Sequence, residues 1–108
     1  MITEDEINTV YAALQLANRD YYKAQEEYLK EKYNLEKNIN RAYADGLITG
    51  KNEIERNGNI AQTFGNQLDH VQDLKVKAED AKYNREWYQI EIDRIQAVIR
   101  LMEVLEEK

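Results

Sequence analysis

The fold of this chain is decided at its centre, by the stretch Asp45-Gly46-Leu47-Ile48-Thr49-Gly50-Lys51-Asn52-Glu53-Ile54-Glu55-Arg56. All four glycines lie between Gly46 and Gly65, and the chain contains no proline. Because glycine and proline are the strongest helix breakers, the two arms on either side of this centre can each form an uninterrupted helix. The stretch is therefore predicted to be a turn that reverses the chain and holds two helical arms together.

Apolar residues recur every seven positions in both arms, as they do in helices that pack along a narrow seam. The two seam positions of the first arm (residues 3–45) are occupied by Ile7, Leu14, Tyr21, Tyr28, Leu35 and Ala42, and by Val10, Ala17, Ala24, Glu31 and Asn38. Those of the second arm (residues 66–107) are occupied by Leu74, Ala81, Tyr88, Ile95 and Met102, and by Val71, Ala78, Arg85, Ile92 and Ile99. Each arm is therefore predicted to be a long amphipathic helix. The apolar seam of the first arm is interrupted by the polar residues Glu31 and Asn38.

Short motifs mark the ends of the first arm. Thr3 followed three residues later by Glu6 is a capping box, in which the threonine side chain accepts a hydrogen bond from a backbone amide of the first turn. Asp45-Gly46 is the predicted stop, because glycine adopts the left-handed conformation that ends many helices.

A second start signal lies in the central region (about residues 46–65), where Asn52 is followed three residues later by Glu55. We expect a short helix from about Glu53. Asn57-Gly58-Asn59 is predicted to interrupt or weaken this helix, and Gly65-Asn66 is predicted to begin the second arm with Asn66 as its cap.

These patterns predict a single all-α domain (residues 1–108), a long antiparallel two-helix hairpin that is coiled-coil-like and has a short central helix. The segment from Trp87 to Leu105 carries apolar residues over more than the roughly 100° that one packed helix covers. We therefore expect the open end of the hairpin to dimerise into a four-helix arrangement or to bind a target protein. The expected interface residues are Trp87, Tyr88, Ile92, Ile95, Ile99, Met102, Tyr11 and Leu14.

Composition disfavours several classes of function. The chain has no cysteine and no serine, which removes disulfides, thiolate metal sites and the common hydroxyl nucleophile. Its formal net charge of −6 disfavours direct binding to a nucleic-acid backbone. His70 is the only histidine, so a two-histidine metal site cannot form. We therefore expect a protein that is not an enzyme and holds no cofactor or metal.

Two further sequence features bear on nucleotides and membranes. Gly50-Lys51 superficially resembles a phosphate-binding loop, but Asn52 stands where that loop requires Ser or Thr, and a helix precedes it instead of a strand. No apolar run approaches the roughly 20 residues that span a bilayer, and the N-terminal residues lack the pattern of a signal peptide. We expect a cytoplasmic protein that does not insert into membranes.

The stretch from Asp45 to Glu53, together with Glu55-Arg56, resembles the central motif of a loose group of small phage and prophage proteins of mostly unassigned function. The chain departs from that group at Asn57-Gly58-Asn59, where such proteins continue with alanine and charged helix formers. The resemblance implies a helical phage-type protein that acts in the host cell by binding protein. A small acidic protein in that setting is expected to be an inhibitor or adaptor of a host defence complex.

The motif itself has two interpretations. As a binding site, its exposed polar members would be Lys51, Asn52, Glu53 and Arg56. As a structural turn, Asn52 would cap the helix, Glu55 would complete the capping box and Arg56 would pair with a nearby acid.

Two alternative functions fit the length and the helical layout. One is a secreted helical-hairpin protein of the small WXG type, in which Phe64-Gly65 would be the nearest equivalent of the missing Trp-x-Gly turn. The other is a structural or assembly factor of the virion.

Overall fold

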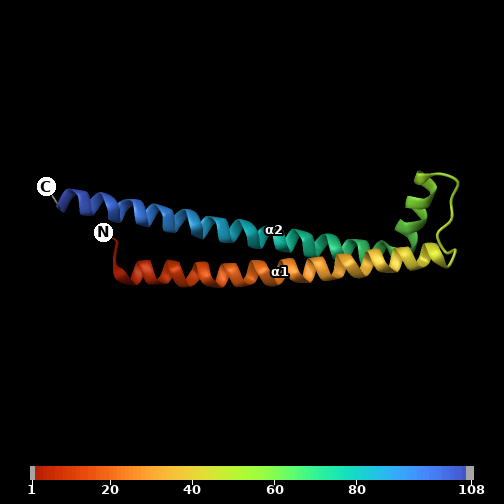
Figure 1. Ribbon diagram of the computed structural model, residues 1–108, viewed down its shortest axis with the longest axis horizontal. Coiled ribbons are helices and arrows are strands. Elements are labelled where there is room, and N and C mark those ends of the chain that lie inside the picture. The colour runs from red at the N-terminus through yellow and green to blue at the C-terminus, as the bar shows by residue number, and fades with distance from the viewer. Residues whose placement is uncertain (1, 107–108) are drawn as a thin grey trace. The chain divides into compact units, whose positions relative to one another are not determined.

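The computed structural model describes residues 2–106, which form two α-helices and no strand (Figure 1). Helix α1 spans Glu4–Ala44 and helix α2 spans Glu53–Glu106. The chain divides into two compact units: unit 1 comprises Met1–Lys23 and Glu79–Lys108, and unit 2 comprises Ala24–Ala78. Each unit therefore pairs one part of α1 with one part of α2, which confirms the predicted all-α helical hairpin.

In unit 1 the two helices run antiparallel. Near one end of the pair, the side-chain amide of Gln96 donates a hydrogen bond to the Tyr11 hydroxyl at 3.1 Å. Further along α1, the Arg85 guanidinium lies 4.8 Å from the centre of the Tyr21 ring. Residue numbers thus rise along α1 while they fall along α2. The core of this unit contains Ala17, Ile92 and Ile95, each only 2% exposed.

Unit 2 contains the turn and a core built largely from small residues. Its buried apolar residues are Ala24, Leu35, Ala42, Ile48, Leu74 and Ala78. Alanine buries little area but lets two helix backbones approach closely, so close packing compensates for short side chains. An exposed ion pair also joins the helices, with Lys77 Nζ 3.9 Å from a Glu27 carboxylate oxygen, and contributes only about 0–1 kcal/mol.

The predicted seams are confirmed along both helices. Every seam residue from Ile7 to Ala42 on α1, and from Val71 to Ile99 on α2, is buried or half-buried. Met102, the last predicted seam residue, is 37% exposed. The polar residues Glu31 and Asn38 occupy their seam positions and are half-buried, so the degraded part of the pattern still follows the same face.

The predicted ends of α1 are also confirmed. The Glu6 amide donates to Thr3 Oγ1 at 3.1 Å. At the other end, the Gly46 amide donates to the Tyr43 carbonyl at 3.2 Å and the Leu47 amide to the Ala42 carbonyl at 2.9 Å. This pair of bonds, with Gly46 at φ +72°, is a Schellman motif that satisfies the last carbonyls of the helix.

The loop between the helices lies tightly against the first turn of α2. A Cβ atom on Gly50 would lie 2.8 Å from the Arg56 backbone nitrogen and 2.9 Å from Glu55 Cβ, so only glycine fits. The Glu55 amide donates to Asn52 Oδ1 at 2.9 Å, which confirms Asn52 as the cap. The Glu55 carboxylate accepts a hydrogen bond from the Lys51 amide at 2.7 Å. Within residues 2–106, Arg56 forms no ion pair, so the predicted pairing of Arg56 with an acid is wrong.

The prediction that Asn57-Gly58-Asn59 interrupts the central helix is also wrong, because these residues lie inside α2. The break occurs at Phe64, whose φ of −117° and ψ of 16° are not helical. Figure 1 shows the first turns of α2 at a steep angle to the helix beyond this kink. The Asn59 side chain donates to the Thr49 carbonyl at 3.4 Å, so it is engaged with the loop and does not compete with the helix backbone.

Candidate functional site

The most unusual surface of the molecule is the outer face of α2 in unit 1. Residues two positions after a seam residue lie about 200° around a helix from it, nearly opposite the seam. On α2 these positions are exposed and mostly apolar. We call this surface the outer stripe; it comprises Tyr83, Trp87, Ile90, Ala97, Leu101 and Val104. The exposed fractions of the five larger residues run from 50% for Val104 to 69% for Tyr83.

The outer stripe has the same spacing as the buried seam. From Tyr83 to Val104, this series of positions follows steps of four and three residues, with Arg94 as the one polar residue between the apolar ones. The Arg94 guanidinium lies 3.2 Å from the carboxylate of Glu91, one turn earlier on the same helix. Single exposed apolar residues are ordinary on a protein surface, whereas six at coiled-coil spacing along one face make a candidate surface for contact with another helix.

Trp87 is the second residue of this surface and packs against a neighbouring aromatic ring. Its ring packs edge-to-face on Tyr88, with ring centroids 4.9 Å apart and an interplanar angle of 81°. Tyr88 is itself half-buried in the seam. A large aromatic ring that is fixed by the fold loses little conformational freedom on binding, which is typical of residues that dominate interface energetics.

The residues predicted as an interface divide between the two faces of the helix pair. Ile92 and Ile95 are buried in unit 1, and Tyr88, Ile99 and Leu14 are half-buried in the same seam. The residues that keep substantial exposure are Trp87, Tyr11 and Met102. The structure adds four exposed residues that the sequence analysis did not single out: Tyr83, Ile90, Leu101 and Val104. The available signal was the step of seven or fourteen residues that relates Tyr83, Ile90 and Val104, and the step of fourteen that relates Leu101 to Trp87.

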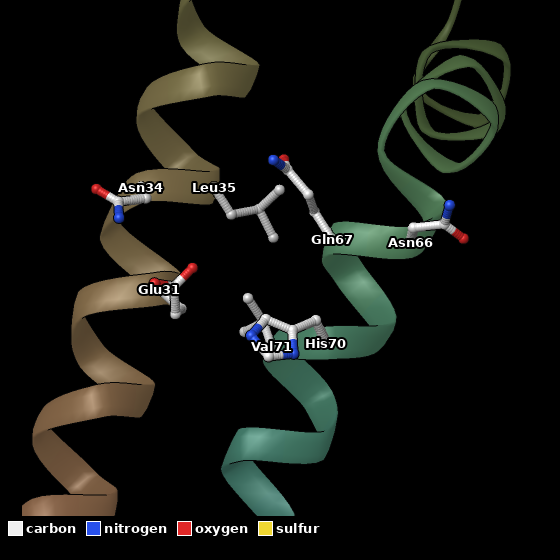
Figure 2. Close-up of a pocket in the computed structure, with 7 residues that line it drawn as sticks. All are labelled: Glu31, Asn34, Leu35, Asn66, Gln67, His70 and Val71. Carbon is white, nitrogen blue, oxygen red and sulfur yellow. The ribbon is translucent and has the colours of Figure 1, made fainter.

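A pocket of 270 Å³ lies between the helices of unit 2 (Figure 2). Its α1 wall consists of Glu31, Asn34 and Leu35, and its α2 wall of Asn66, Gln67, His70 and Val71. Figure 2 shows Leu35 pointing toward α2, whereas Asn34 and Asn66 lie at the outer sides of the two helices. The pocket forms where Glu31 replaces an apolar seam residue, because a carboxylate does not fill the space between two apolar helices.

The groups in this pocket do not assemble a reactive centre. The lining offers one carboxylate, one imidazole and three amides, without a hydroxyl or thiol nucleophile. Within residues 2–106, no group of three or more His, Cys, Asp or Glu side chains is placed to hold a metal ion. The pocket is therefore a polar gap in the seam, and the outer stripe is the stronger candidate for function.

The residues of the central motif mainly stabilise the turn between the two helices. Asn52 caps α2 and the Lys51 amide is bonded to Glu55. The side chains of Lys51 and Glu53 are exposed, and Arg56 is half-buried. This geometry favours the structural interpretation of the motif.

Neither helix contains, within residues 2–106, a segment long and apolar enough to cross a membrane. No protein-family model, curated protein or solved structure matches this chain.

Proposed function

We propose that this chain is a non-enzymatic protein-interaction module that binds a helical surface through the outer stripe. The observation that carries the proposal is the second apolar row on α2, which has coiled-coil spacing and is exposed while the first row is buried. Coiled-coil spacing favours a helical partner because side chains at alternating steps of three and four insert between residues of a facing helix.

The size of the exposed side chains supports a contact of useful strength. Complete burial of an Ile, Leu or Val side chain is worth about 1.5–3 kcal/mol, before the costs of association are subtracted. Tyr83 and Trp87 add two large aromatic side chains, which are frequent hot spots of protein interfaces.

We further propose the biological setting that the central motif implies. The resemblance of Asp45–Arg56 to small phage proteins supports a phage-type inhibitor or adaptor that acts on a host protein complex in the host cytoplasm. An acidic protein can bind a basic surface on such a complex, and the net charge of −6 is compatible with this role.

The test is affinity capture from infected host cells with a tagged chain, in which an untagged copy of the chain counts as a captured protein. Ile90→Asp places a charge in the outer stripe and is expected to abolish capture. Leu16→Asp is the matched control, because Leu16 is exposed to a similar degree on α1 and lies outside the stripe; it is expected to capture normally. Trp87→Ala is expected to weaken capture at least about tenfold, as a hot-spot residue does.

Retention of every captured protein by Ile90→Asp would show that the outer stripe is not the binding surface. Far-UV circular dichroism of each variant verifies that the helices remain folded.

A further inference from the structure

Acidic side chains follow one edge of the outer stripe. We call this edge the acidic row; it comprises Glu79, Glu86 and Asp93. Each member is exposed and lies four residues before a residue of the stripe, as Glu86 does before Ile90. Because residues four apart are neighbours on a helix surface, the three carboxylates run beside the apolar side chains. In a contact of coiled-coil spacing, residues at such positions lie at the rim and face the second helix.

The charge of the acidic row is not neutralised within the described residues. In residues 2–106, none of its carboxylates forms an ion pair with a lysine or an arginine. Asp93 accepts a hydrogen bond from the neutral Gln89 amide at 3.1 Å, which leaves its charge in place. The Arg94 guanidinium lies 3.2 Å from Glu91 and is therefore offset by that residue. Lys82 lies on the side of the row away from the stripe, so it does not face a helix bound there.

The other edge of the stripe adds no positive charge. It comprises Asn84, Glu91 and Val98, each of which directly follows a stripe residue. On the acidic edge, the next position of the same spacing is Arg100, so the negative charge accompanies the part of the stripe from Tyr83 to Ala97. A helix that covers this part meets an edge of net negative charge.

A second copy of the stripe does not complement this edge. In an antiparallel pair of stripes, the acidic row of one copy would face the acidic row of the other. In a parallel pair, it would face the edge of the second copy that contains Glu91. Like charges disfavour both arrangements. The complementary positive charge therefore comes from a helix of different sequence.

We infer that the outer stripe binds an amphipathic helix that carries lysine or arginine at seven-residue spacing along the edge that faces Glu79, Glu86 and Asp93. This inference rests on the proposed function and names the chemistry of the partner at the same site. Exposed ion pairs are individually weak, so burial of the apolar side chains supplies most of the affinity. The acidic row selects which amphipathic helix binds and favours its register.

Two synthetic helices serve as probes of this preference. Each is about four heptads long, long enough to be helical, with leucine at both core positions. They differ only at the two rim positions, which are lysine in the basic helix and glutamate in the acidic helix. Like charges along both rims oppose self-association of either probe. Neither probe contains tryptophan or tyrosine.

Trp87 reports directly on occupancy of the stripe. It is the only tryptophan of the chain, belongs to the stripe and is 55% exposed. A helix that covers its indole ring replaces water by apolar contacts, which shifts the fluorescence emission to shorter wavelength. A titration followed at this emission therefore gives the dissociation constant of each probe at this surface.

The native chain is expected to bind the basic helix at least about tenfold more tightly than the acidic helix, because three exposed pairs are attractive with one probe and repulsive with the other. Reversal of the acidic row, by Glu79→Lys with Glu86→Lys and Asp93→Lys, is expected to invert this preference. Far-UV circular dichroism verifies that the reversed variant remains helical.

The matched control reverses three exposed acids of α1, by Asp20→Lys with Glu26→Lys and Glu36→Lys. It changes the net charge by the same amount as the reversed row but leaves the edge of the stripe intact. This control is expected to keep the preference for the basic helix. A native chain that binds both helices equally, or a reversed row that keeps the native preference, overturns the inference.

The outcomes also separate the inference from the proposed function. Equal binding of both helices that is lost in Ile90→Asp contradicts the charge preference but supports the stripe as an interaction surface. A native dimer that Ile90→Asp dissociates in sedimentation equilibrium contradicts the inference, because a second copy then occupies the stripe. A Trp87 emission that responds to neither helix contradicts the inference, and unchanged capture by Ile90→Asp from infected cells then contradicts the proposed function as well.

Discussion

Within unit 1, the two faces of α2 have the same apolar spacing but very different environments. Ile92 on the inner face is 2% exposed, whereas Ile90 on the outer face is 63% exposed. The residues are of the same type and lie within one turn of each other. Apolar spacing thus predicts which helix faces can pack against another helix, but does not by itself say which face the chain covers with its own residues.

The inner face is covered because α1 offers a matching seam within the same chain. Ala17 is small and buried, and Leu14 and Tyr21 flank it at seam spacing. The turn at Gly46 keeps the two helices at high effective concentration, so the inner contact forms within one molecule. The outer face is exposed among residues 2–106, and under the proposed function its contact would depend on protein concentration.

The largest expected effect is a difference in the free energy of unfolding between substitutions on the two faces of α2. Ile92→Ala is expected to lower the free energy of unfolding by about 2–5 kcal/mol, because a buried side chain is removed and leaves a cavity. Ile90→Ala is expected to change it by no more than about 0.5 kcal/mol when the chain is dilute, as for other exposed positions. Urea denaturation followed by circular dichroism measures both values.

A titration with the basic helix gives the control for this comparison. The Ile90→Ala deficit is expected to grow as this helix is added, because the native chain gains stability from association, while the Ile92→Ala deficit is present at every concentration. Equal losses for the two variants in dilute solution would mean that the outer face is also covered within the chain.

Ionic strength is expected to affect the inner and outer faces of α2 differently, and this effect is smaller than that of the two isoleucine substitutions. The inner face is held by apolar contact, so the unfolding free energy of the dilute chain changes little with salt. The exposed acids Glu79, Glu86 and Asp93 lie beside the outer stripe, so the dissociation constant of a contact made there is expected to rise about three- to tenfold between low and high salt because of screening. Sedimentation equilibrium at several salt concentrations measures the change. A contact that strengthens with salt would contradict an electrostatic contribution from these acids.

The inner seam could be predicted almost completely from the sequence, because it depends on regular spacing that a helix converts directly into one face. Thr3 and Gly46 were identified equally well, since capping involves only neighbouring residues. The break at Phe64 lies within two residues of Gly65-Asn66, where the second arm was predicted to begin, whereas the interruption predicted at Asn57-Gly58-Asn59 was wrong. Glycine in a helix costs only about 1 kcal/mol, so Gly58 is tolerated where the Asn59 side chain is engaged with Thr49.

In the sequence, the outer stripe could be recognised only because the apolar residues of this segment cover a wider arc of the helix than one packed partner needs. The segment from Trp87 to Leu105 was predicted to carry apolar residues over more than one face, but its residues were not separated into two faces. Ile92 and Ile95 were therefore grouped with Trp87, although the structure buries both isoleucines and leaves Trp87 55% exposed. The separation depends on the register of α1 against α2, which long-range contacts such as that of Tyr11 with Gln96 reveal.

The smallest expected effect compares two arginines, one on each face. The Arg85 guanidinium lies 4.8 Å from the Tyr21 ring centre and 5.9 Å from that of Tyr22, and the side chain is half-buried. Arg85→Ala is expected to lower the free energy of unfolding by about 1 kcal/mol, through the lost cation–π contact and lost packing of the arginine stem. Arg94→Ala loses only an exposed ion pair with Glu91, so in dilute solution it is expected to cost less than about 0.5 kcal/mol. Urea denaturation measures both, with Arg85→Lys as the variant that keeps the charge but removes the planar group. A larger loss for Arg94→Ala in dilute solution would reverse the assignment of the two faces, because the exposed arginine would then contribute more to the folded monomer than the one in the seam.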